Sequence, residues 1–109
     1  MAKRIVAVLA DLIFAVRITD AAKRAGVEIA LVKTLDAALE QSPGAALVIL
    51  DLDFAPPEWI AKLKQNAAPM IGYVSHVQTD VIKSAREAGC ETILARSAFV
   101  QKLAEIVSL

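Results

Sequence analysis

The chain has 109 residues, of which 57% are hydrophobic and 5% aromatic, and its twelve basic residues balance twelve acidic ones. This length suits one domain with a substantial core, so we expect a single domain over residues 1–109, packed mainly with Ala, Val, Ile and Leu. The balanced charge, without a basic run, excludes a general nucleic-acid binder. A single cysteine, Cys90, excludes an internal disulfide and a cysteine-based metal cluster.

The start of the chain, MAKRIVAVLADLIFAV, combines basic residues with an apolar run, as a secretion signal does. However, Asp11 and Arg17 interrupt that run, and no small-residue cleavage site follows it. No apolar stretch is long enough to cross a bilayer. We therefore expect a cytoplasmic protein without membrane contact.

Five short apolar runs are bounded by polar or turn residues. Runs of this kind predict strands that are buried on both faces, as in a parallel sheet. The predicted strands are residues 4–9, 28–32, 46–52, 70–75 and 92–95.

The stretches between these runs have the spacing of amphipathic helices. The first, DLIFAVRITDAAKRAG, ends at Gly26, a residue type that favours helix ends. Thr34 is placed to cap the second helix, and Pro57 lies in the first turn of the third. QTDVIKSAREAG and SAFVQKLAEIVSL supply the fourth and fifth. The apolar face of the fifth helix comprises Phe99, Val100, Leu103, Ile106 and Val107.

Five strands that alternate with five helices predict a doubly wound α/β sandwich. Because crossovers between parallel strands are right-handed, we expect a flavodoxin-like parallel sheet of order 2-1-3-4-5. In such folds the carboxyl ends of the strands form the functional site. The residues at these ends are Asp11, Asp51, Asp53, Ser75 with His76, and Arg96 with Ser97.

Acidic, hydroxyl and cationic side chains at one sheet edge could hold a divalent metal and a phosphoryl group. Carboxylates are hard oxygen ligands of the kind that Mg²⁺ prefers. Asp51 could act as a nucleophile, while Ser75 and Arg96 bind the phosphoryl oxygens. A simpler interpretation is purely structural: Asp51 and Asp53 cap the following helix, Asp11 caps the first helix, and Ser75 bonds loop amides.

Over almost its whole length the chain resembles the receiver domain of two-component response regulators, and three motifs carry this resemblance. LVILDLDFAPP is similar to the family's hydrophobic-D-L-x-M-P phosphoacceptor motif, and IGYVSH to its fourth strand, which ends in Thr or Ser. AREAGCETILARSAF is similar to the family's A-x-x-A-G-A helix end and the strand that closes with Lys-Pro. The resemblance implies that Asp51 is the phosphoacceptor and that Ser75 and Arg96 bind the phosphoryl group. It also implies a weak metal site made of Asp11, Asp51 and the backbone carbonyl of Asp53.

The sequence departs from the family pattern at several strand ends. Receivers carry two adjacent acids after the first strand, whereas VLADL offers Asp11 alone. The invariant Lys-Pro is replaced by Arg96 and Ser97, and the aromatic residue of the fifth strand by Ile93. Arg96 could pair bidentately with Asp51 and fill the site with an internal cation. We therefore predict a degenerate pseudo-receiver without efficient phosphorylation of Asp51; the alternative is an active, Mg²⁺-dependent phosphoacceptor.

The resemblance further implies a stand-alone signalling domain that acts by binding another protein, either a histidine kinase or a downstream regulator. In receivers the binding surface is usually the fourth helix, fifth strand and fifth helix, here residues 80–109. The apolar residues of the last helix, with Phe99 near its start, also favour a homodimer. We expect no catalytic residue and no cofactor other than Mg²⁺.

Other functional classes lack their motifs. A flavin site needs a loop rich in Ser, Thr and Gly after the first strand, but LADLIF has none of them, and a cobalamin motif Asp-x-His-x-x-Gly is absent. A hydrolase with Ser75 as nucleophile needs a base and a glycine-flanked turn, and the adjacent His76 would point elsewhere. We therefore predict that His76 is a loop residue and that Cys90 is buried and inert.

Overall fold

The computed structural model describes residues 3–66, 68–75 and 79–108. The strands of this part of the chain form one parallel sheet of order β2-β1-β3-β4-β5, so the predicted flavodoxin-like topology is confirmed. The strands are β1 (Arg4–Val8), β2 (Glu28–Val32), β3 (Leu47–Asp51), β4 (Met70–Val74) and β5 (Thr92–Ala95). The helices are α1 (Leu12–Ala25), α2 (Leu35–Gln41), α3 (Pro57–Lys64), α4 (Thr79–Ala88), α5 (Arg96–Gln101) and α6 (Leu103–Val107).

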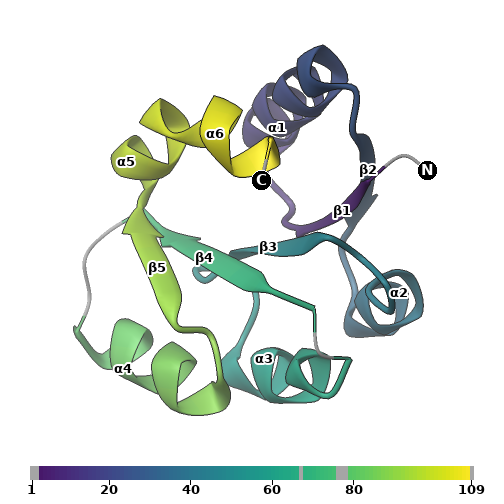
Figure 1. Ribbon diagram of the computed structural model, residues 1–109. Helices are drawn as coiled ribbons and strands as arrows, with labels where there is room; N and C mark the ends of the chain where they lie inside the picture. Colours follow the sequence, from purple (N-terminus) through teal and green to yellow (C-terminus); the bar gives the residue numbers. More distant parts are fainter. Residues whose placement is uncertain (1–2, 67, 76–78, 109) are drawn as a thin grey trace.

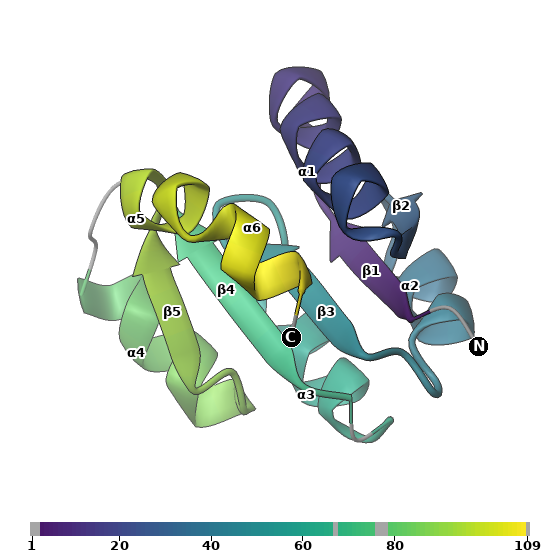
Figure 2. The same cartoon turned by 45° about the horizontal axis from the view of Figure 1, so that its top comes forward.

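The helices cover both faces of the sheet. Helices α1, α5 and α6 lie on one face, and α2, α3 and α4 lie on the other (Figures 1 and 2). Because side chains alternate along a strand, β1 sends Ile5 and Ala7 into the first layer and Val6 and Val8 into the second. None of the described helices is long and apolar enough to span a membrane.

Burial on both faces holds for the inner strands but not for the edges. Strand β4 is fully buried, and β3 is buried up to Asp51. In β2 and β5, by contrast, most side chains are half-buried or exposed. The prediction that all five strands are buried on both faces is therefore wrong for these two, because a strand at a sheet edge has a neighbour on one side only.

The ends of the first two helices follow the predicted local rules. The Oδ1 atom of Asp11 accepts hydrogen bonds from the amides of Ile13 (2.9 Å) and Phe14 (3.1 Å) at the start of α1. Gly26 ends that helix with a φ of 71°, a left-handed conformation that glycine adopts without steric cost. Thr34 caps α2 through the amide of Ala37. These caps confirm the predicted ends of α1 and the predicted start of α2.

The predicted fifth helix is divided into two short helices, α5 and α6, which meet at Lys102. Its apolar face does not lie on the surface. Four of its side chains are buried against α1 and the sheet: Phe99, Leu103, Ile106 and Val107. The prediction of a homodimer through this face is therefore wrong, because the domain's own core already covers these side chains.

An aromatic cluster of Phe14, Tyr73 and Phe99 packs α1 and α5 against strand β4 of the sheet. The ring centroid of Tyr73 lies 4.6 Å from that of Phe14 and 4.9 Å from that of Phe99, and the two phenylalanine centroids are 5.6 Å apart. All three side chains are buried. Since they come from α1, β4 and α5, the cluster fixes the spacing of three elements whose ends border the carboxyl edge of the sheet.

The Tyr73 hydroxyl is buried without a hydrogen-bond partner among the described residues. Burial also raises the pKa of Tyr73 well above its usual value, so the group stays protonated. An unpaired buried hydroxyl costs about 1–3 kcal/mol. We therefore expect Tyr73→Phe to leave the free energy of unfolding unchanged or to raise it by about 1 kcal/mol, as measured by urea denaturation. A clear loss of stability would mean that the hydroxyl has a partner in solution.

Candidate functional site

The carboxyl edge of the sheet brings together the polar residues predicted from the sequence. Asp51 is the last residue of β3, Asp11 follows β1, and Arg96 directly follows β5 as the first residue of α5. Asp53 and Ser75 lie just beyond the ends of β3 and β4. The predicted convergence is thus confirmed for the described residues, whereas His76 lies outside them.

Arg96 is bonded to Asp11. Its Nη2 atom donates a hydrogen bond of 2.8 Å to Oδ2 of Asp11, and its guanidinium carbon lies 4.5 Å from the centroid of the Phe14 ring. A carboxylate and an aromatic face therefore hold the same cation. The predicted ion pair between Arg96 and Asp51 is wrong. The guanidinium instead contacts the carboxylate of Asp11 and the ring of Phe14, which both lie at the start of α1.

Both carboxylate oxygens of Asp11 are engaged. Oδ1 caps α1 through the amides of Ile13 and Phe14, and Oδ2 accepts from Arg96. The amide of Phe14 and then the guanidinium of Arg96 lower the pKa of Asp11, against a smaller effect of burial. Asp11 is therefore ionised at neutral pH, and its structural role as the α1 cap is confirmed.

Asp51 is half-buried at the end of β3. Its Oδ1 accepts from the amide of Asp53 at 3.0 Å, while no described residue donates to Oδ2. Burial raises the pKa of Asp51, and the Asp53 amide and the positive charge of Arg96 act in the opposite direction. One oxygen of the predicted phosphoacceptor is thus held by the backbone and the other accepts nothing from its described surroundings.

Asp53 connects two strand ends in a way that the sequence did not reveal. Its Oδ2 accepts a hydrogen bond of 2.7 Å from the amide of Ser75. Neither Asp51 nor Asp53 caps α3, because that helix starts after Pro56 without a side-chain cap. The capping interpretation of these two acids is therefore wrong; they organise the loop and the end of β4 instead. The spacing of two acids around Leu52 was the only signal for this arrangement.

No three His, Cys, Asp or Glu side chains in the described ranges are placed to hold a metal ion. The predicted set used two carboxylates, Asp11 and Asp51, with the backbone carbonyl of Asp53, and it stays a prediction. Cys90 lies elsewhere, buried in the layer of α2, α3 and α4. Burial raises the pKa of its thiol to about 11, in agreement with the prediction of an inert side chain.

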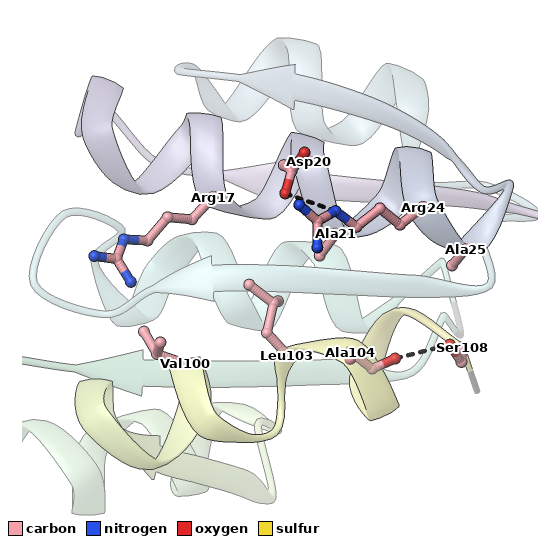
Figure 3. Close-up of a pocket in the computed structure, with 9 residues that line it drawn as sticks. All are labelled: Arg17, Asp20, Ala21, Arg24, Ala25, Val100, Leu103, Ala104 and Ser108. Carbon is pink, nitrogen blue, oxygen red and sulfur yellow. Dashed lines mark hydrogen bonds and ion pairs between the residues drawn. The ribbon is translucent and has the colours of Figure 1, made fainter.

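A groove of about 390 Å³ lies on the α1–α6 flank, apart from these strand ends (Figure 3). Arg17 and Arg24 of α1 border it, and Arg24 pairs with Asp20 at 3.1 Å. Arg24 belongs to the last turn of α1, and Ser108 at the far end of the groove follows α6. The groove therefore extends away from the carboxyl edge and does not add residues to the Asp11–Asp51 site.

Comparisons with known proteins identify the fold. No family model matches the chain, and no curated protein matches it by sequence. Solved structures of response regulators, however, superpose over almost its full length. The phosphorylated cyanobacterial phytochrome response regulator RcpA has a TM-score of 0.79 at 18% identity, with 99% of this chain and 90% of that chain covered.

Two further structures agree. The CheY-like receiver domain protein of Methanospirillum hungatei JF-1 has a TM-score of 0.78 at 15% identity and covers 98% of this chain and 94% of its own. The signal receiver domain of NarL from Mycobacterium tuberculosis has a TM-score of 0.79 at 16% identity, with 97% and 93% covered. The chain therefore has the fold of response regulator receiver domains.

Proposed function

We propose that this protein is a receiver-type signalling domain of the cytoplasm that acts by binding another protein, without efficient phosphorylation of Asp51. The observation that carries this proposal is the contact between Arg96 and Asp11. In this contact the guanidinium of Arg96 is bonded to Asp11, the only acid between β1 and α1. A receiver of this kind would communicate through its surface and would not depend on a phosphoryl group.

The residues present fit a divalent ion poorly. Before Asp11 could bind a metal ion, one of its oxygens would have to lose its hydrogen bonds. Either Oδ2 would lose the bond from Arg96, or Oδ1 would lose the bonds that cap α1. Mg²⁺ demands near-ideal octahedral geometry and several oxygen ligands. The side chain of Asp53 is also occupied, since it accepts from the Ser75 amide. Two carboxylate oxygens at this edge accept nothing from a described residue, namely Oδ1 of Asp53 and Oδ2 of Asp51.

Oδ2 of Asp51, which accepts no hydrogen bond from a described residue, supports a second candidate function. In an active phosphoacceptor, Oδ2 of Asp51 would be the attacking atom, and Ser75 and Arg96 would meet the phosphoryl oxygens. Ser75 is exposed at the end of β4, so its hydroxyl is accessible. This alternative requires Arg96 to leave Asp11 and Phe14.

The proposed partner is a histidine kinase or a downstream regulator, and the proposed surface is the α4–β5–α5 face. Arg96 gives this surface a connection to the site, because it is both the partner of Asp11 and the first residue of α5. Any change at Asp11 would therefore act on the start of α5. Since the apolar side of α5 and α6 is buried, recognition would use their exposed polar residues, including Ser97, Gln101 and Lys102.

Intact-mass analysis after incubation with acetyl phosphate and Mg²⁺ tests the proposal. We expect no phosphoryl adduct on the folded protein, because Asp11, which would have to bind the metal ion, is already paired with Arg96. Asp51→Asn is the control for phosphorylation elsewhere, and circular dichroism verifies the fold. An adduct on the natural protein that is missing in Asp51→Asn would establish the second candidate function.

A further inference from the structure

The loop after β3 is folded into a turn that presents the Asp53 side chain to the end of β4. The amides of Phe54 (3.0 Å) and Ala55 (2.8 Å) both donate to the carbonyl oxygen of Asp51, which closes the turn. The amide of Asp53 donates to Oδ1 of Asp51 at 3.0 Å. Local backbone bonds of this kind define a turn by themselves. The Asp53 carboxylate is therefore not needed to form the turn and is available for a contact outside it.

Leu52 anchors the same loop to β4. Its amide donates to the carbonyl oxygen of Tyr73 at 3.0 Å, and its buried side chain packs over Gly72. A Cβ atom at Gly72 would lie 2.7 Å from Cδ1 of Leu52, so a larger residue there would force the Leu52 side chain to move. The residues on both sides of Asp53 are thus held in place, and its carboxylate is preorganised as an acceptor.

The Ser75 amide lies beyond the last residue pair of β4. That strand ends at Val74, which pairs with Ala95 of β5, and no backbone carbonyl of the described residues accepts from the Ser75 amide. Oδ2 of Asp53 accepts from this amide at 2.7 Å. An ordinary amide bond measures about 2.9–3.0 Å, whereas a bond to a charged acceptor is shorter. A carboxylate therefore takes the place of a backbone partner at the end of β4.

We infer that Asp53 is a positioning residue, whose carboxylate holds the end of β4 beside the loop after β3 and so limits where α4 can begin. Three residues separate Ser75 from Thr79, the first residue of α4. A connection of this length spans at most about 14 Å. A fixed Ser75 therefore restricts the start of α4. The inference rests on the proposed function in one respect, because it matters for signalling only if α4 belongs to the partner-binding surface.

Two side-chain links at the carboxyl edge then act on the two helices of the proposed surface. Arg96 connects the start of α5 to Asp11, which follows β1, and Asp53 connects the loop after β3 to the residue that follows β4. Neither link uses Oδ2 of Asp51, so neither has to break when that oxygen gains a partner. Asp53 thus acts on the α4 side of the surface as Arg96 acts on the α5 side.

Native-state hydrogen exchange of the isotope-labelled full chain, followed by NMR, tests the inference. Asp53→Ala removes the acceptor of the Ser75 amide but leaves the backbone bond to Asp51. We therefore expect exchange at Ser75 to become about fivefold faster or more, and exchange at residue 53 to stay the same. Asp53→Asn retains a side-chain oxygen and should restore most of the protection. Glu91→Ala removes an exposed acid at the opposite edge of the sheet and is the matched control, expected to change neither rate.

Backbone amide chemical shifts test the effect on α4. We expect Asp53→Ala to shift the resonances of Thr79–Ala88 and to leave those of α2 unchanged. An unchanged Ser75 rate, unmoved α4 resonances, or equal rates in Asp53→Asn and Asp53→Ala would each overturn the inference. So would a uniform acceleration that includes the buried amides of β3, since that result indicates a general loss of stability. These measurements involve no phosphorylation, so the inference and the proposed function can fail separately.

Discussion

Replacing Phe14 by alanine is expected to lower the free energy of unfolding by about 3–5 kcal/mol, the largest loss we expect from a single substitution. The Phe14 side chain is buried and packs against the rings of Tyr73 and Phe99. Its ring also contacts the guanidinium of Arg96, whose central carbon lies 4.5 Å from the ring centroid. The substitution would therefore open a cavity between α1 and the sheet and remove one of the two contacts that hold Arg96.

Urea denaturation monitored by circular dichroism measures this loss. Phe54→Ala is a matched control, because Phe54 is half-buried and makes a single edge-to-face ring contact with Trp59. We expect it to cost about 1–2 kcal/mol, in the range of ordinary substitutions. Equal losses for the two variants would mean that the aromatic cluster does not contribute more than a peripheral phenylalanine.

The double substitution Ala10→Asp with Arg96→Lys is expected to strengthen Mg²⁺ binding and to permit phosphorylation of Asp51, which we expect to be inefficient in the natural chain. Ala10 is exposed beside Asp11, so an acid there supplies a carboxylate that is not committed to capping α1. Lysine keeps the positive charge but cannot reproduce the planar contacts of Arg96 with Asp11 and Phe14. Since affinity rises with the number of charged ligands, we expect Mg²⁺ binding to strengthen about tenfold or more.

Isothermal titration with Mg²⁺ and intact-mass analysis after acetyl phosphate treatment measure the two gains separately. Each single substitution is a control: Ala10→Asp alone retains the Arg96 contact, and Arg96→Lys alone lacks the second acid. Adding Asp51→Asn to the double variant should abolish the adduct. If the folded double variant neither binds Mg²⁺ nor takes up a phosphoryl group, then the Arg96–Asp11 contact is not what limits this site.

Local signals in the sequence were sufficient for most of the architecture. Gly26, Thr34 and Pro57 each act within one helical turn, so their effect on a helix end can be inferred without knowing the rest of the fold. The apolar runs located all five strands to within a residue or two. The strand order then followed from right-handed crossovers and short connections. Placement of Asp11, Asp51 and Arg96 at one edge was a consequence of that topology.

Long-range contacts explain what the sequence could not predict. Asp11 and Arg96 are 85 positions apart. The guanidinium pairs with Asp11 at a place where it also lies over the Phe14 ring, and the position of that ring depends on the folded structure. The bond from the Ser75 amide to Asp53 spans 22 positions and joins two loops. The exposure of Leu31 likewise depends on β2 being an edge strand, which no property of the segment itself reveals.

The contact between Arg96 and Asp11 also has a consequence for how the domain responds to its surroundings. A dissolved ion occupies a site to a degree that follows its concentration, whereas a guanidinium belonging to the chain cannot diffuse away. Releasing Asp11 therefore requires the Arg96 side chain to change its conformation or the start of α5 to move, and a protein bound to this helix could favour either change. The carboxyl edge of the sheet would then respond to a bound protein more than to a divalent ion, while salt would weaken the partly exposed ion pair only by screening.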